Sequence, residues 1–233
     1  MARRTKEEAL ATRSRILDAA ERVFHEKGVS SASLEDIAAA AEVTRGAIYW
    51  HFKDKAELFD AMMQRVVLPV DEMLERSECC AQAEPLELLR RAAIDVLLRT
   101  ARSRQMQRVF DIAYHKCEYV DDGSGVRERQ VASQQECLRT IESGFRACVK
   151  HGQLPAGVDP RAAAIGALSL VSGLIAAWVL APTSFSLERH AEYLVDTYFR
   201  GLASTPGSRR AALRAPRARA RRQPHLISAR PRK

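Results

Sequence analysis

Residues 43–52 read VTRGAIYWHF, and this stretch decides the fold because small, aromatic and basic residues are nowhere else so dense. Thr44 is suited to cap a helix, since its hydroxyl can accept a hydrogen bond from a backbone N–H group of the first turn. From Arg45 the sequence fits about two helical turns, in which Ile48 and Phe52 lie four residues apart and share an apolar face. The stretch therefore predicts a short helix with one side buried.

The other sides of this short helix are suited to contact with a polyanion. Gly46 and Ala47 leave its first turn almost bare, so another surface can approach closely. Four larger side chains, basic or aromatic, lie outside the apolar face: Arg45, Tyr49, Trp50 and His51.

The residues before this helix complete a helix-turn-helix pattern. Residues 33–40 read SLEDIAAA, which begins with a Ser33…Asp36 pair of the capping-box type and continues with strong helix formers. Residues 41–43 then form a turn. Two short helices joined by such a turn make a motif whose second helix enters the DNA major groove by its N-terminal end.

Residues 1–60 resemble the DNA-binding domain of the TetR family of bacterial repressors. The segments MARRTKEEA at 1–9 and TRGAIYWHF at 44–52 are similar to the AcrR and TtgR branch of that family, whose members repress multidrug efflux pump operons. A weaker similarity continues to about residue 200, through HKCEY at 115–119 and GQLP at 152–155.

One position in the turn departs from the family pattern. Glu42 stands where the family usually has Gly, so it must adopt the backbone conformation of the turn, and it places a negative charge near the DNA. We expect this residue to lower the affinity for DNA and to leave the fold unchanged.

The positive charge of the chain is concentrated at its C-terminal end. The 233 residues include 37 basic and 29 acidic side chains, a net charge of +8. Residues 204–233 contain nine Arg and one Lys without any Asp or Glu, so the rest of the chain has 27 basic against 29 acidic residues. This basic tail has few large apolar residues, which predicts a disordered segment. It either adds sequence-independent affinity for DNA or is a solvated appendage without a task.

Composition and motifs indicate a reduced cytoplasmic protein that is not an enzyme. Hydrophobic residues make up 46% of the chain, enough for a sizeable core. The five cysteines are odd in number and lack metal-ligand spacing, and the N-terminus lacks the apolar core of a signal peptide. There is no phosphate-binding loop or nucleophile elbow, and His115 and Cys117 would point apart on one helix. We predict no cofactor and no metal site.

Helical periodicity continues to residue 202 and nothing reads as a strand, so the predicted fold class is all-α. An N-terminal three-helix helix-turn-helix head is followed by a larger helical ligand-binding and dimerisation domain. The expected helices begin at or cover residues 12–27, 33–40, 44–52, 54–67, 85 onward, 104–119, 126–149, 160–181 and 186–202. The expected domains are residues 1–55 for DNA binding, 56–203 for ligand binding and dimerisation, and 204–233 for the disordered tail.

Residues 162–181 carry no charge, which meets the length rule for a membrane span. The segment is rich in Ala, Gly and Ser, and it is the only one of its kind. We predict instead a helix buried on all sides, partly by a second subunit, because Gly166 and Gly173 would let another helix approach. The resemblance implies the same, since the family dimerises through its last two long helices.

The predicted DNA contacts divide into base readout and phosphate anchoring. Arg45 is expected to read a base, because an Arg fork can bond guanine O6 and N7 together. Thr44, Tyr49 and His51 carry donors without such a fork and are expected to hold phosphates. The resemblance implies a phosphate contact for Lys55 in the next helix.

The remaining DNA predictions concern approach and neighbouring segments. Ser33, at a helix N-terminus, could bind a phosphate, and Gly46 and Ala47 permit close approach. Trp50 either contacts DNA or packs against the first helix. The basic residues at 3–6 are either a phosphate or minor-groove arm or an ordinary frayed terminus.

Twelve residues on five predicted helices are candidates for a ligand pocket. Taken alone they fit a protein core, and it is the family resemblance that implies a drug pocket between these helices. They are Val66, Val67, Val70, Val96, Phe110, Tyr114, Gln134, Cys137, Ile141, Val171, Ser172 and Trp178.

The polarity of the expected pocket differs from that of some relatives. These relatives place His, Asp and Arg at the positions of Val67, Val70, Ser172 and Ala176. Their absence predicts a more apolar pocket that selects less by charge. Three possible polar groups remain: Asp111, Glu118 and Gln134.

The sequence therefore predicts a homodimeric repressor without membrane contact. It would bind a palindromic double-stranded DNA operator, control a multidrug efflux pump operon and be released by small hydrophobic drug-like ligands. The alternative is a ligand-independent helix-turn-helix protein or nucleoid-type DNA binder. Ligand-dependent release from a defined operator would separate the two.

Overall fold

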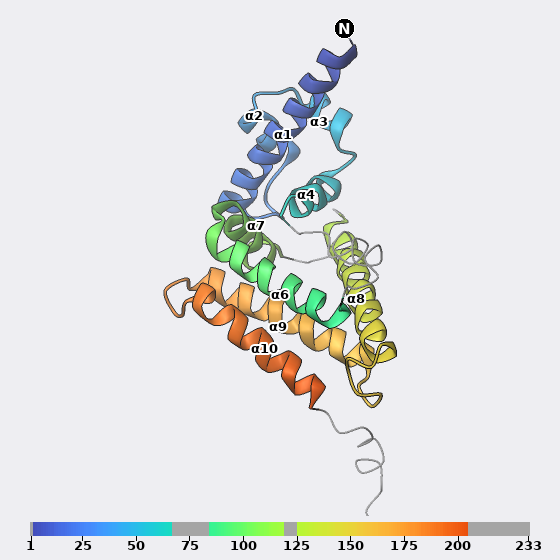
Figure 1. Ribbon diagram of the computed structural model, residues 1–233. Helices are drawn as coiled ribbons and strands as arrows, with labels where there is room; N and C mark the ends of the chain where they lie inside the picture. Colours follow the sequence, from blue (N-terminus) through green and yellow to red (C-terminus); the bar gives the residue numbers. More distant parts are fainter. Residues whose placement is uncertain (1, 67–83, 119–124, 205–233) are drawn as a thin grey trace, which may run out of the picture.

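The computed structural model describes residues 2–66, 84–118 and 125–204, and within these ranges all regular structure is helical (Figure 1). The predicted fold class is therefore confirmed. The predictions for Val67, Val70 and the basic tail beyond Ser204 lie outside the described residues. The helices are α1 (Ala2–Lys27), α2 (Leu34–Ala40), α3 (Arg45–His51), α4 (Lys55–Gln64), α6 (Pro85–Arg102), α7 (Arg104–His115), α8 (Val126–Lys150), α9 (Pro160–Leu180) and α10 (Leu187–Ala203).

A common apolar core joins α1, α2 and α3, as their helical spacing predicts. Ile16, Phe24, Ile37, Ile48 and Phe52 are each at most 1% exposed. The last of these ends α3 as its C-cap in an extended conformation, yet its ring stays in the core. The short helix with one buried side is thus held by the same core as its neighbours.

α1 is longer than the apolar spacing predicts. It begins at Ala2 instead of residue 12 and ends at Lys27, where Gly28 has the expected positive φ of 79°. Residues 2–11 are mostly Ala, Arg, Lys and Glu, which favour helix without needing a buried face. Apolar periodicity therefore identified only the part of α1 that packs against the core.

Caps at both helices fix the turn between α2 and α3. Ser33 accepts from the Asp36 N–H at 3.1 Å, and the Asp36 carboxylate accepts from the Ser33 N–H at 3.0 Å, which confirms the predicted capping box. Thr44 caps α3 by accepting from the Ala47 N–H at 3.2 Å. In the turn, Glu42 has a φ of 55°, a left-handed conformation that is costly for a residue with a Cβ. The turn therefore forms without the usual Gly, at the cost of local strain.

α4 contacts both the helix-turn-helix and the larger part of the molecule. Asp54 caps it by accepting from the Glu57 N–H at 2.7 Å, as its sequence predicts. Phe59 packs against Phe24 of α1 with 6.1 Å between the ring centroids, and α4 also touches α8. The helix ends at Gln64, before the predicted end near residue 67.

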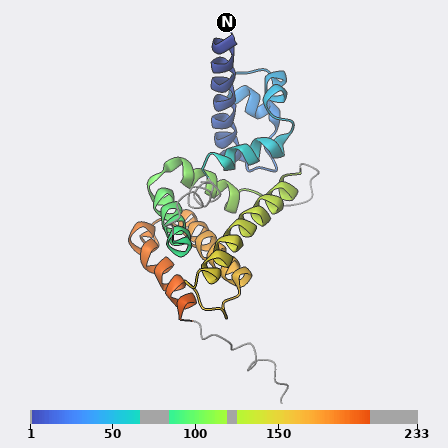
Figure 2. The same ribbon diagram turned by 45° about the vertical axis from the view of Figure 1, so that its right-hand side comes forward.

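Helices α6 to α10 form the larger part of the molecule, away from α2 and α3 (Figures 1 and 2). α6 lies beside α10, and α7 and α8 both pack against α9. The predicted helix starts are confirmed at Pro85, at Asp159 with Pro160, and at Ser186. The beginnings of these helices are thus encoded locally in the sequence.

α7 ends at His115, earlier than its predicted end at residue 119. Here the chain meets the end of α1: the Val29 N–H donates to the Lys116 carbonyl at 2.9 Å, and Lys116 Nζ donates to the His25 carbonyl, also at 2.9 Å. These long-range bonds involve Val29 and Lys116, which lie just beyond the ends of α1 and α7, and a local pattern cannot reveal them.

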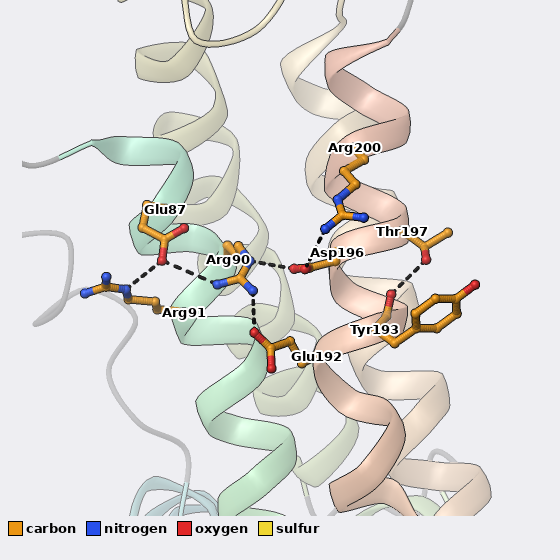
Figure 3. A network of polar contacts seen from close by, with 8 residues as sticks. All are labelled: Glu87, Arg90, Arg91, Glu192, Tyr193, Asp196, Thr197 and Arg200. Atoms are coloured by element: carbon orange, nitrogen blue, oxygen red, sulfur yellow. Dashed lines mark hydrogen bonds and ion pairs between the residues drawn. The ribbon is translucent and has the colours of Figure 1, made fainter.

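Arg90 joins α6 to α10 (Figure 3). Its guanidinium donates to Asp196 at 2.5 Å and to Glu192 at 2.8 Å, both on α10. Glu87 accepts from both Arg90 and Arg91 on α6. The hydrogen bond to Asp196 raises the pKa of Arg90, and the same bond lowers the pKa of Asp196. Both groups remain charged and hold the two helices together.

α9 contains the uncharged segment and is only partly covered by its own chain. It is long and apolar enough to cross a membrane, with a mean hydropathy of 2.1, and 22% of its most apolar window is buried. Ile175 is buried, whereas Ile165 and Leu180 are 47% and 68% exposed. Within the described ranges, residues of the same chain therefore do not bury α9 on all sides.

Candidate DNA interface and ligand region

α3 presents an exposed surface opposite its buried side. Ile48 is fully buried, while Tyr49 and Trp50 are 47% and 73% exposed. This settles the position of Trp50: it does not pack against α1, but stands outward, with its ring edge-on to His51 at a centroid distance of 4.5 Å. Large aromatic side chains exposed on one short helix mark a surface for a partner.

Arg45 is held in place on this surface by two side chains. It forms an ion pair with Glu35 of α2, and its Nη2 donates to the Tyr49 hydroxyl at 3.0 Å. Its guanidinium carbon lies 5.4 Å from the centre of the Tyr49 ring. These contacts raise the pKa of Arg45, first through Tyr49 and then through Glu35. The residue predicted to read a base is thus oriented before DNA arrives.

His51 and Arg13 lie close together beside the end of α3. Burial lowers the pKa of His51, and the positive charge of Arg13 adds to this effect. Arg13 itself lies over the Phe52 ring, 5.0 Å from its centre. A neutral imidazole can still donate one hydrogen bond to a phosphate, but it adds no positive charge at pH 7.

Two of the predicted phosphate contacts are engaged within the protein. The Lys55 ammonium donates to three backbone carbonyls, of Val29 at 2.9 Å, Ser30 at 3.1 Å and Ala32 at 3.3 Å. Within the chain, the positive charge of Lys55 is thus stabilised by carbonyl oxygens of the loop before α2. The Ser33 hydroxyl donates to the Asp36 carboxylate at 2.8 Å. Both side chains have clear structural roles, and their DNA contacts remain predictions.

Gly46 and Ala47 lie in the first turn of α3, directly after the cap. Within the described part of the chain, a Cβ at Gly46 would meet the Thr44 hydroxyl oxygen alone, at 3.8 Å, which is an ordinary contact. A glycine inside a helix costs stability relative to Ala. The fold itself therefore does not require the bare surface at Gly46.

Four of the predicted ligand residues lie together where α7 faces α9 and α8, namely Phe110, Tyr114, Ser172 and Cys137. Phe110 stacks on Tyr114 with 6.1 Å between the ring centroids, and Tyr114 hydrogen-bonds to Ser172. Tyr114 is 41% exposed overall, yet partial desolvation of its phenol raises its pKa, and the nearby Cys137 contributes. His115 approaches the Ala176 carbonyl at 3.0 Å. The structure thus brings together aromatic and hydroxyl groups from two of the predicted helices and a thiol from a third.

The other predicted ligand residues differ in exposure. Gln134 is exposed and is not enclosed by the residues that the structure describes. Three residues are buried, namely Val66, Phe110 and Trp178. Intermediate exposure is found for Val96, Cys137, Ile141, Val171 and Ser172. These positions fit both a core and a pocket lining, so their ligand contacts remain predictions.

Asp111, one of the predicted polar groups of the pocket, faces α1. Asp111 lies 3.4 Å from His25 and 3.8 Å from Lys116, on the side of α7 that meets α1. It is therefore not a polar group of the region around Tyr114. Residue spacing placed Asp111 and Tyr114 on the same helix but did not show which neighbour each would face.

Two surface hollows lie away from the predicted ligand residues. One of about 600 Å³ is beside the Arg90 network between α6 and α10. Another of about 310 Å³ lies between α1 and α7 and is lined by Glu21 and Arg108, which pair at 3.1 Å. Glu21 is only 4% exposed. Arg108 is 42% exposed, so only the acidic partner of this ion pair is buried. The sequence offered no signal for the pair, because its partners are far apart along the chain.

Comparison with known proteins accounts for both parts of the molecule. The family model described as bacterial regulatory proteins, tetR family, matches residues 16–62. The model described as MAATS-type transcriptional repressor, C-terminal region, matches residues 84–204. The HTH-type transcriptional regulator TtgR of Pseudomonas putida is 38% identical over 210 residues, which cover 90% of this chain and 100% of TtgR.

Solved structures extend the similarity to three dimensions. NalD, the secondary repressor of the MexAB-OprM multidrug efflux pump in Pseudomonas aeruginosa, has a TM-score of 0.75 and 36% identity, covering 86% of this chain and 100% of NalD. SmeT, solved in complex with triclosan, has a TM-score of 0.74 and 30% identity, covering 92% of this chain and 100% of SmeT. SmeT represses the Stenotrophomonas maltophilia pump SmeDEF. This chain belongs to the TetR family of bacterial transcriptional regulators, with an N-terminal helix-turn-helix and a C-terminal ligand-binding domain.

Proposed function

We propose that this protein is a ligand-responsive repressor of a multidrug efflux pump operon, and that it binds a palindromic operator. The observation that carries the proposal is the outward surface of α3, where Arg45, Tyr49 and Trp50 are exposed around the buried Ile48. Its neighbours Thr44, Gly46 and Ala47 leave the N-terminal end of the helix open to a DNA groove. TtgR, NalD and SmeT support the choice of function.

The proposed inducer is a small hydrophobic drug-like molecule. The aromatic stack of Phe110 and Tyr114 offers apolar surface, and the Tyr114–Ser172 pair offers hydroxyl groups. The complex of SmeT with triclosan supports this ligand class. A ligand releases DNA only through a different affinity for the two states of the protein. α7 is well placed to couple ligand binding to the DNA-binding helices, because it carries Phe110 and Tyr114 and also contacts α1.

The active unit of the proposal is a cytoplasmic homodimer. Two copies of α3 would read the two half-sites of the palindrome. The uncovered apolar side chains of α9, including Ile165 and Leu180, suit burial against a second copy. The division at residue 55 and the tail from residue 204 belong to the same proposal, in which the basic tail attracts phosphates without reading sequence.

The test uses purified full-length protein and the DNA upstream of its own gene. We expect a footprint on a palindrome in this DNA, and its loss on addition of triclosan or a related hydrophobic drug. Arg45→Ala should weaken operator binding by about 5- to 150-fold and change random-duplex binding little. Equal affinity of the wild type for upstream and random DNA would instead support the nucleoid-type alternative. A footprint that no drug disturbs would support a ligand-independent regulator.

A further inference from the structure

Glu35 is an acidic neighbour of the residue expected to read the bases. It lies in the first turn of α2, and its carboxylate pairs with Nη1 of Arg45 across the helix-turn-helix. Both side chains are more than half exposed, at 55% for Glu35 and 58% for Arg45. On the other side, Nη2 of Arg45 donates to Tyr49 at 3.0 Å. The guanidinium is therefore held between two helices on the outer surface of the motif.

This arrangement leaves the guanidinium able to bind a base. A guanidinium has five N–H donors, so contacts with one carboxylate and one hydroxyl leave donors for the two acceptors of a guanine. A long side chain that is already oriented loses less conformational freedom when it binds. Glu35 thus favours one orientation of Arg45 over the many that a free side chain would sample.

The same carboxylate opposes binding to every DNA sequence. Phosphates repel Glu35 on operator and random duplexes alike. On a random duplex, Arg45 finds no guanine in register and stays paired with Glu35 instead of reaching a phosphate. On the operator, the base contact offsets the repulsion. We therefore expect Glu35 to weaken the binding of random DNA more than the binding of the operator.

We propose that Glu35 is a positioning residue that sets specificity, because it orients Arg45 for base contact and restrains it from phosphates. The inference rests on the proposed function, since it requires Arg45 to read a base in an operator. Tyr49 completes the restraint from within α3, through its hydroxyl and its ring.

The experiment compares Glu35→Gln with the wild type in the full-length protein. Each is titrated against the operator and a random duplex at several salt concentrations. We expect Glu35→Gln to bind the random duplex about threefold more tightly, with a smaller change on the operator, so that the ratio of the two affinities falls. Base preference at the position read by Arg45 should relax. The thermal melting temperature should not change, because the side chain is exposed.

Glu42→Gln is the matched control for charge. Glu42 is also exposed, in the turn just before α3, and Arg45 pairs with Glu35 and not with it. Removing the charge of Glu42 should raise the affinities for both duplexes by the same factor. The ratio of the operator affinity to the random-duplex affinity should therefore not change. In an Arg45→Ala background, Glu35→Gln should no longer change the ratio, since its effect on specificity acts through Arg45.

Three results would overturn the inference. Glu35→Gln could change the affinities for both duplexes by the same factor, as Glu42→Gln does, which would make Glu35 a simple surface charge. Glu35→Gln could change the ratio of operator to random-duplex affinity equally in the wild type and in the Arg45→Ala background, which would show that Glu35 does not act through Arg45. It could lower binding to both duplexes together with the melting temperature, which would make its role structural. A wild type without preference for the upstream DNA would refute the proposed function itself, and that outcome is visible before any variant is made.

Discussion

α3 and α9 are both left partly uncovered by their own chain, but the side chains they expose are of opposite character. On α3 the exposed groups are polar or aromatic, with Trp50 at 73% and Tyr49 at 47%. On α9 they are aliphatic, with Leu180 at 68% and Ile165 at 47%. Groups with hydrogen-bonding capacity tolerate water and suit a polyanion, whereas aliphatic surface gains most by burial against another apolar surface. Both exposed surfaces are candidates for an interface, and the chemistry of their side chains indicates which partner fits each.

The largest expected effect comes from α9, where Gly173 and Gly166 lie in two differently packed parts of the helix. Among the residues that the structure describes, no atom lies within 4 Å of a Cβ placed at Gly173. Gly173→Leu should therefore leave the single chain folded but overpack the proposed dimer contact, at a cost of about 1–3 kcal/mol of dimer stability. Sedimentation equilibrium should show more monomer, and operator affinity should fall with it.

Gly166→Leu on the same helix is the contrast. A Cβ there would collide with the phenol of Tyr198, whose hydroxyl donates to the Ala163 carbonyl at 2.6 Å. This variant should lower the free energy of unfolding itself, as measured in urea. A Gly173→Leu protein that dimerises like the wild type would show that this side of α9 is not the interface.

The next prediction tests whether Lys55 stabilises the fold or holds a DNA phosphate. Its ammonium satisfies three carbonyls of the loop before α2, so Lys55→Ala should lower the free energy of unfolding by about 1–3 kcal/mol. Urea unfolding measures this directly. The exposed neighbour Lys53 provides the control, and Lys53→Ala should unfold like the wild type. Unchanged stability of Lys55→Ala with uniformly weaker DNA binding would favour the phosphate anchor.

A smaller effect is expected at Gly46, with opposite signs for stability and binding. The space beside Gly46 accepts a Cβ within the chain, so Gly46→Ala should raise the free energy of unfolding by about 0.5–1 kcal/mol. The added methyl group would stand where DNA approaches, so operator affinity should fall. Thermal unfolding and operator titration measure the two effects. Retained operator affinity would mean that DNA does not come close to this turn.

The smallest effect concerns acid sensitivity near α2. The hydrogen bond from Lys27, with those from Ser33, lowers the pKa of Asp36 from 3.8 to about 2. Because the folded state binds this proton more weakly than the unfolded state, the stabilisation is present above pH 4 and is lost as the pH falls toward 2. Asp36→Asn should reduce the loss of stability across this range, as measured by urea unfolding at each pH. Equal acid sensitivity of variant and wild type would contradict the lowered pKa.

Local chemistry in the sequence determined the helix-turn-helix and most helix starts. Ser33, Thr44, Asp54, Asp159 and Ser186 each cap a helix through a backbone N–H two or three residues away, so sequence neighbours suffice to predict them. Apolar spacing likewise predicted the core, because residues on one helical face must be buried together. It missed residues 2–11 of α1, whose composition favours a helix by propensity.

Tertiary structure alone decided what the side chains of the candidate sites do. The outward position of Trp50, the ion pair of Glu35 with Arg45, the carbonyl contacts of Lys55 and the pairing of Asp111 with His25 all depend on how one helix lies against another segment. A capping bond spans a few residues and is fixed by local backbone geometry. A contact between separate segments depends on the packing of the whole core, so no local pattern in the sequence encodes it.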